Sequence, residues 1–182
     1  MGKWNFWTGG GGTGPAGPPG PSVVQFSIAT DGVTVQAVNS AGALLYSGAD
    51  AGAAVTACLP TVGSGGAHIS FRNEGNSFPW TTAPLIPSGL TKKLRIDGNG
   101  STIGLNGNAL QFLGINRTAD YQTFQHVKIT GFKVDCTSLT NTSGSPLGLI
   151  GTSSSATPGQ RVNFLDWVIE DVYFTNVDVE SC

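Results

Sequence analysis

Two carboxylates, Asp97 and Glu170, come closest to a catalytic arrangement in type and spacing. Both lie among alternating apolar and polar residues, as in Leu94-x-Ile96 and Trp167-x-Ile169. Because side chains alternate between the two faces of a strand, the pattern predicts one outward column of Asp97, Thr130 and Glu170. Strands about 4.8 Å apart would separate the carboxylates by roughly 9–10 Å, near the upper end for inverting glycosidases. A solvated strand face would also carry scattered carboxylates, and both interpretations stay open.

The neighbouring polar residues add no clear catalytic group. The same alternation predicts a second outward column of Arg95, Lys128 and Val168. His68 and His126 lie in strand-like segments without an obvious acid or nucleophile partner, so we interpret them as ordinary strand residues. No calcium loop is predicted, because the ordered ligand spacing is missing from the acidic residues Asp166, Glu170 and Asp171. The cysteines are too far apart for a zinc site and are interpreted as buried or free thiols: Cys58, Cys136 and Cys182. We therefore expect no metal and no cofactor.

A repeated apolar template must position these side chains. Val127-x-Ile129-x-x-Phe132-x-Val134 matches Trp167-x-Ile169-x-x-Val172-x-Phe174, and Leu94-x-Ile96 supplies the first half of an earlier copy. The offsets are 33 and 40 residues, which implies loops between the copies, notably at 137–160. Each copy is two short strands joined by a bend, and it must stack on its neighbours to bury its apolar side chains. The predicted core consists of the apolar residues of these three copies, with Trp167 closing one end of a stacked row.

The residues before the template predict a different local structure. Alternating apolar residues and Asp-Gly and Ser-Ala-Gly turns over 23–49, including Val33, Val35 and Ala37, predict a short β-meander. Asp50 is placed to cap an Ala-rich helix over about 50–59, which Pro60 would end. This helix and the stacked strands make up the expected domain at 50–182.

Composition narrows the functional class. Charged residues make up 11% of the 182 residues, with 27 Gly in their place, and the net charge is −2. This balance suits a β-rich extracellular or particle-borne protein better than a cytosolic enzyme. No basic run could neutralise phosphates, so nucleic acid is not an expected partner. No 18-residue apolar stretch or secretory signal occurs, so we expect no membrane span and an export route such as cell lysis.

The segment 14–22 has glycine at every third position, at Gly14, Gly17 and Gly20. Glycine at this period is what three polyproline-II strands need around a crowded common axis. The pattern predicts a short collagen-like stalk and hence a homotrimer. A stiff proline-rich linker is the alternative, because so few triplets are not stable alone.

The first segment, 1–13, places Trp4, Phe6 and Trp7 before a glycine hinge at 9–12. Large aromatic side chains gain most from filling a pocket on another protein, so these rings are predicted to anchor the chain to a partner. A terminus without a docking role is the other interpretation.

The order of features from 24 to 180 resembles the N-terminal region of pectate-lyase-like β-helix proteins, especially phage tailspikes and tail-appendage proteins. The matching elements are the hairpin from Asp31-Gly32 to Asp50, the Ala-rich helix, His68-Ile69-Ser70-Phe71, Pro84-Leu85-Ile86-Pro87, and the segment from Leu94 to Gly100. The resemblance implies a right-handed parallel β-helix with a short capping helix, often within a homotrimer. Together with the β-meander and the collagen-like stalk predicted above, the expected fold class is all-β. Family members carry more coils than can be counted here, so we expect these residues to lead a longer polypeptide.

The resemblance implies a structural virion protein that is located in the phage tail and is extracellular. It would be a tail fibre, tailspike or minor tail protein that docks on tail or baseplate proteins and presents its β-helix to host-surface glycan. One alternative is a polysaccharide depolymerase, a lyase or glycoside hydrolase, with its active site outside this stretch. Another is a bacterial collagen-like surface protein, which the missing secretion signal disfavours. Whether the chain is an enzyme stays open.

Overall fold

A computed structural model describes residues 23–61, 66–87, 93–107, 111–116, 122–139, 148–152 and 162–177. The predicted anchor, hinge and stalk at 1–22 lie outside the described residues, as does Cys182. Strands dominate what is described, together with one short α-helix, and the predicted all-β class is confirmed. The elements are β1 (Val24–Thr30), β2 (Val35–Asn39), β3 (Leu44–Gly48), α1 (Ala51–Cys58), η1 (Leu59–Thr61), β4 (Ala67–Phe71), β5 (Phe78–Trp80), β6 (Leu85–Pro87), β7 (Leu94–Gly107), β8 (Gln111–Asn116), β9 (Gln122–Leu139), β10 (Gly148–Thr152) and β11 (Val162–Thr175).

The first three strands pair antiparallel in chain order. Asp31 forms the turn between β1 and β2, because its Oδ1 accepts hydrogen bonds from the amides of Val33 (2.8 Å) and Thr34 (2.6 Å). Val33 was expected in the alternating strand, but it lies in this turn with 76% of its surface exposed. The strand starts at Val35, whose side chain is fully buried.

Helix α1 begins where the sequence predicts it. The Asp50 side chain accepts a hydrogen bond from the Gly52 amide (2.9 Å), which caps the first turn. The same oxygen accepts from the Thr81 amide (3.1 Å), so Asp50 also ties the helix to the segment after β5. Partial burial raises the pKa of Asp50, but hydrogen bonds from Thr82, Thr81 and Gly52 outweigh it and hold that pKa below its ordinary value. A Cβ at Gly52 would lie 1.7 Å from the Thr82 carbonyl oxygen, so only glycine permits this close packing.

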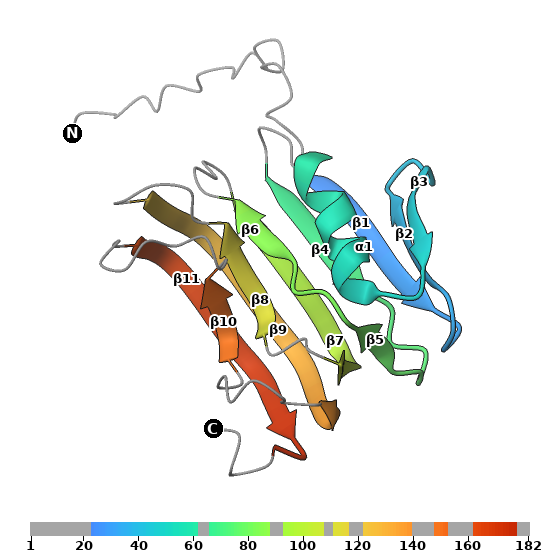
Figure 1. Cartoon of the computed structure of the whole chain (residues 1–182). Coiled ribbons are helices and arrows are strands. Elements are labelled where there is room, and N and C mark those ends of the chain that lie inside the picture. The colour runs from blue at the N-terminus through green and yellow to red at the C-terminus, as the bar shows by residue number, and fades with distance from the viewer. Residues whose placement is uncertain are drawn as a thin grey trace, which may run out of the picture.

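Five strands stack in parallel beside this helix, in the order β1, β4, β7, β9 and β11 (Figure 1). Their registers place equivalent residues in columns that run across all five strands. One inward column is Phe26, Ile69, Ile96, Ile129 and Ile169. The pairings of Val127 with Leu94 and with Trp167 confirm the predicted offsets of 33 and 40 residues.

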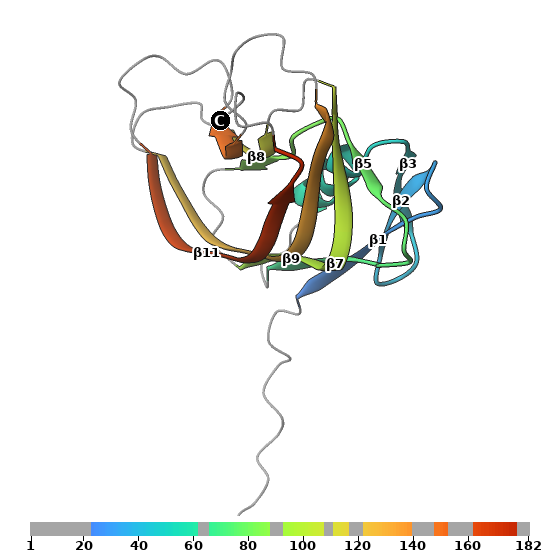
Figure 2. The same cartoon turned by 90° about the horizontal axis from the view of Figure 1, so that it is seen from below.

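A second parallel sheet contains β6, β8 and β10. Seen along the stack, β7, β9 and β11 curve around an interior, and β8 lies on the opposite side (Figure 2). The side chains of Phe112, Leu113 and Ile115 in β8 are buried in the same core as β9. The two sheets therefore enclose one apolar core between them.

The long strands bend at residues with a left-handed backbone. In β11 the positive φ values fall at Asp166, Asp171 and, just after the strand, Asn176, five residues apart. In β9 they fall at His126 and Gly131, which lie in the positions opposite Asp166 and Asp171. Each bend turns the chain while the next apolar residue keeps facing inward. The two unspecified positions in the middle of the apolar template are therefore the end of one straight segment and the bend itself.

Most of the predicted core is confirmed. The residues of β7 and β9 are fully enclosed: Leu94, Ile96, Val127, Ile129, Phe132 and Val134. The β11 residues of the same template are only partly buried: Trp167, Ile169, Val172 and Phe174. Among the described residues β11 pairs with β9 alone, so its inward side chains are covered from one side only. Trp167 does end a column, and its Nε1 donates to the Phe124 carbonyl oxygen (2.9 Å).

An aromatic cluster at the centre of the core was not predicted. Phe71 packs edge-on against Phe132, with ring centroids 5.1 Å apart. Trp80 stacks on Phe112 at 4.9 Å, and its Nε1 donates to the Phe112 carbonyl oxygen (3.1 Å). Because these rings come from β4, β5, β8 and β9, the cluster joins both sheets.

Candidate functional site

The outward face of the five-stranded stack carries the predicted columns. Asp97 lies opposite Thr130, and Thr130 lies opposite Glu170, as the alternation requires. Two strand spacings therefore separate Asp97 from Glu170, which corresponds to about 9–10 Å between their backbones. Thr130 stands between them and is buried, with 8% of its surface exposed.

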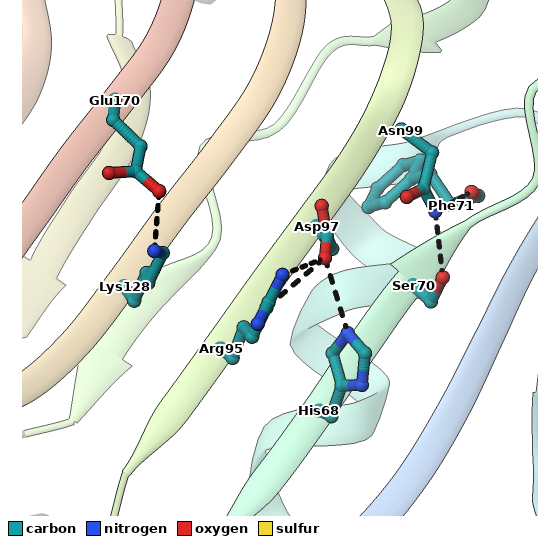
Figure 3. A network of polar contacts seen from close by, with 8 residues as sticks. All are labelled: His68, Ser70, Phe71, Arg95, Asp97, Asn99, Lys128 and Glu170. Carbon is teal, nitrogen blue, oxygen red and sulfur yellow. Dashed lines mark hydrogen bonds and ion pairs between the residues drawn. The ribbon is translucent and has the colours of Figure 1, made fainter.

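Asp97 belongs to a small ionic cluster on β4 and β7 (Figure 3). Its Oδ2 accepts hydrogen bonds from Arg95 Nη2 (2.6 Å) and Nε (3.1 Å). His68 approaches from the adjacent strand, with its Nε2 3.6 Å from the same oxygen. The Asp97 carboxylate is therefore held by Arg95 on its own strand, while His68 on the next strand lies within ion-pair distance without a hydrogen bond to it.

Glu170 forms a separate ion pair with Lys128, from β11 to β9 (Figure 3). The two predicted carboxylates thus lie in one column but belong to different ion pairs. This geometry supplies two compensated charges on a strand face. The hypothesis that they act together as acid and base stays a prediction.

The interpretation that both histidines lack an acidic partner is wrong. His126 Nδ1 lies 3.0 Å from Asp166 Oδ2, and His68 lies near Asp97. The hydrogen bond from His126, aided by the charge of Lys93, holds the pKa of Asp166 below its ordinary value. Asp166 follows His126 by 40 residues, the offset between Val127 and Trp167. That offset, applied to the residue just before each apolar pair, was the signal in the sequence for this contact.

A groove of about 280 Å³ opens beside these pairs, at the start of the straight segments of β7, β9 and β11. Its lining contains three cationic side chains, one carboxylate, one histidine and three apolar residues: Lys93, Arg95, Lys128, Asp166, His126, Leu94, Val127 and Val168. Sequence reasoning named Arg95, Lys128 and Val168 as a column, but it missed Lys93. Lys93 directly precedes Leu94, as His126 precedes Val127 and Asp166 precedes Trp167. The groove therefore lies where two columns of residues meet. One contains the bend positions Lys93, His126 and Asp166, and the other is the outward column of Arg95, Lys128 and Val168.

Asn99 holds the next bend along β7 (Figure 3). It has a left-handed φ of 52°, and its Nδ2 donates to Ser70 Oγ and to the Phe71 carbonyl oxygen, both at 2.9 Å. These bonds tie the bend of β7 to β4. The outward face is thus fixed by side-chain contacts between strands as well as by the backbone ladder.

The described residues contain no cluster of three or more His, Cys, Asp or Glu side chains that could hold a metal ion. Cys58 and Cys136 are buried, and burial raises the pKa of the Cys58 thiol to about 12. In the described ranges, no helix combines the length and the apolar character needed to cross a membrane.

Comparison with known proteins identifies no relative: no family model, curated protein or solved structure matches this chain. Any functional conclusion therefore depends on the chain's own residues.

Proposed function

We propose that this chain is the tail-proximal part of a trimeric phage tail fibre or tailspike, built on a right-handed parallel β-helix that binds host-surface polysaccharide. The observation that carries the proposal is the set of in-register parallel columns across β1, β4, β7, β9 and β11. Stacked parallel strands, joined by bends and closed by a second parallel sheet, are the arrangement of a solenoid coil. A helix capped by Asp50 beside the first strands supports the resemblance described above.

The sequence of 1–22 supports the attachment and the trimer. Glycine at every third position from Gly14 to Gly20 fits three chains around one axis. The aromatic residues Trp4, Phe6 and Trp7 precede it and suit a socket on another virion protein. In this proposal, residues 1–8 dock on the tail or baseplate and the strand stack projects toward the host.

The attachment is tested by deleting residues 1–8. We expect the deleted protein to remain soluble and trimeric by mass photometry, yet to be missing from purified particles, because only the docking rings are lost. Particles that keep the shortened protein at normal copy number would contradict the attachment. A stable monomer of the full chain would contradict the trimer.

A polysaccharide depolymerase is the second candidate, and one observation favours it. His126 has an acidic partner beside a groove, and a histidine oriented by a carboxylate can move a proton in a reaction. The test is to incubate the full chain with host polysaccharide and to measure new reducing or unsaturated ends. Their appearance, and their loss in His126→Gln, would support this candidate over simple binding.

A further inference from the structure

We propose that three copies of this chain pack side by side along the first bend of their coils, with Leu165 of one copy against Val168 of the next. This inference rests on the proposed trimer and names the surface that forms it. The first-bend column consists of the residues that directly precede the inward row from Val24 to Trp167: Val23, Gly66, Lys93, His126 and Asp166.

The stalk brings this column close to the common axis. In the proposed stalk Gly20 lies at the axis shared by three chains, and Val23 is only three residues farther along. An extended chain advances at most about 3.6 Å per residue, so Val23 lies within roughly 11 Å of Gly20. Strand β1 starts on the side of the core opposite β8 (Figure 2). The first-bend column therefore starts beside the axis, and the second sheet faces away from it.

The column runs along the direction in which the strands stack. Parallel strands lie about 4.8 Å apart, so the four steps from Val23 to Asp166 cover roughly 19 Å. In the proposed function the stack projects away from the tail, along the axis of the stalk. The column therefore stays beside the axis as far as Asp166, and the two sides of the coil that meet at the bend face the two neighbouring copies.

Each of these two sides carries an exposed apolar residue on β11. Leu165 lies one residue before the bend with 53% of its surface exposed, and Val168 lies two residues after it with 39% exposed. The residues paired with them on β9 are polar, Gln125 and Lys128. A ring of three copies brings unlike sides of neighbouring copies together, so Leu165 of one copy covers Val168 of the next. Both apolar side chains are then removed from water.

The charges beside the bend allow identical copies to approach one another. The face carries three cations and three carboxylates: Lys93, Arg95, Lys128, Asp97, Asp166 and Glu170. With its histidines neutral the face has no net charge, so three copies do not repel one another as like-charged faces would. Lys93 is exposed and has no carboxylate within ion-pair distance among the described residues, and 55% of the Asp166 side chain is exposed. Both groups are thus accessible to a neighbouring copy.

The test places the photo-crosslinking residue p-benzoylphenylalanine at position 168 of the full chain. After irradiation we expect covalently linked chains on a denaturing gel, and mass spectrometry should map the link to 162–166 of another copy. Position 173 is the matched control. Tyr173 is also exposed on β11, but it lies beyond the Asp171 bend and so on another side of the coil. The same residue at that position should give no link between chains.

A second measurement uses charge. Val168→Asp adds a carboxylate to each copy beside the axis, so the protein concentration at which the trimer dissociates should rise about tenfold or more. Tyr173→Asp adds the same charge on the other side and should dissociate like the wild type. Sedimentation measures both variants. Because both side chains are exposed, circular dichroism should show that each variant folds like the wild type.

Each outcome separates this inference from the proposed function. Links between chains from position 173 and none from position 168 would overturn the contact and leave the trimer intact. So would a trimer that gives no link from either position, or equal weakening by Val168→Asp and Tyr173→Asp. Links from position 168 only to another tail protein, in purified particles, would assign this face to a different partner and overturn the inference. A stable monomer of the full chain would overturn both the trimer and the contact.

Discussion

Strands β9 and β11 carry the same apolar template in register, but their surroundings differ. β9 lies between β7 and β11, and its inward residues Phe132 and Val134 are fully enclosed. The residues opposite them in β11, Val172 and Phe174, are only partly buried. The difference shows that the burial of a template residue depends on strands on both sides, and that the pattern of a single strand does not determine it. The following variants test this comparison, from the largest expected effect to the smallest.

Phe132→Ala should cost about 3–5 kcal/mol of unfolding free energy, because it leaves a cavity in the aromatic cluster with Phe71 and Phe112. Phe174→Ala should cost about half as much, since part of that ring already contacts water. Denaturant unfolding followed by circular dichroism measures both. Equal losses would mean that β11 is covered as completely as β9.

The bends give a second comparison. Gly131 has a φ of 75°, and a Cβ there would lie 3.1 Å from the Asn99 amide nitrogen, so Gly131→Ala should cost about 1–2 kcal/mol. Asp171 occupies the equivalent bend in β11 with a φ of 53°, so Asp171→Gly should relieve backbone strain and leave stability unchanged or slightly higher. Thermal unfolding of the two variants decides the point. A destabilised Asp171→Gly would indicate that the aspartate side chain itself holds the bend.

The ion pair between β9 and β11 should contribute less. Lys128 and Glu170 are both partly exposed, so a double-mutant cycle with Lys128→Gln and Glu170→Gln should give a coupling of about 0.2–1 kcal/mol. The coupling should decrease as salt is added. A coupling that salt leaves unchanged would show that the pair is shielded from water.

The His126–Asp166 contact should produce a small pH effect. Because the folded protein lowers the pKa of Asp166 below its ordinary 3.8, the ionised carboxylate stabilises the fold. This contribution is complete above the ordinary pKa and is lost as the pH falls through the lowered one. Asp166→Asn should therefore be less stable than the wild type near neutral pH, and the difference should disappear in strong acid. An NMR titration of the Asp166 carboxyl carbon, with a midpoint at or above 3.8, would contradict this.

Local patterns in the sequence predicted what depends on nearby residues. The cap at Asp50, the turn at Asp31 and the outward columns through Asp97 and Lys128 all follow from local spacing and from the repeat offset. The aromatic cluster did not follow, because Trp80 and Phe112 lie in short strands that do not repeat the template. The groove was not predicted for a related reason: the residues at its bend positions lie outside the inward–outward alternation of the strands.

The five-residue spacing of the bends has a consequence for how the stack folds. If β11 slid by five residues along β9, Val162 or Val172 would replace Trp167 beside Val127, and the apolar columns would still face inward. Hydrophobic burial alone therefore distinguishes poorly between the native alignment and alignments displaced by one bend.

Glu170 does not repeat at this spacing. The positions five residues before and after it are Leu165 and Thr175, so only the native alignment places a carboxylate at the position that pairs with Lys128. Trp167 adds to the discrimination, because its indole reaches the Phe124 carbonyl from one position only. A surface ion pair of small energetic value can thus select among nearly equivalent strand pairings during folding. Without it, the slipped pairings would become kinetic traps.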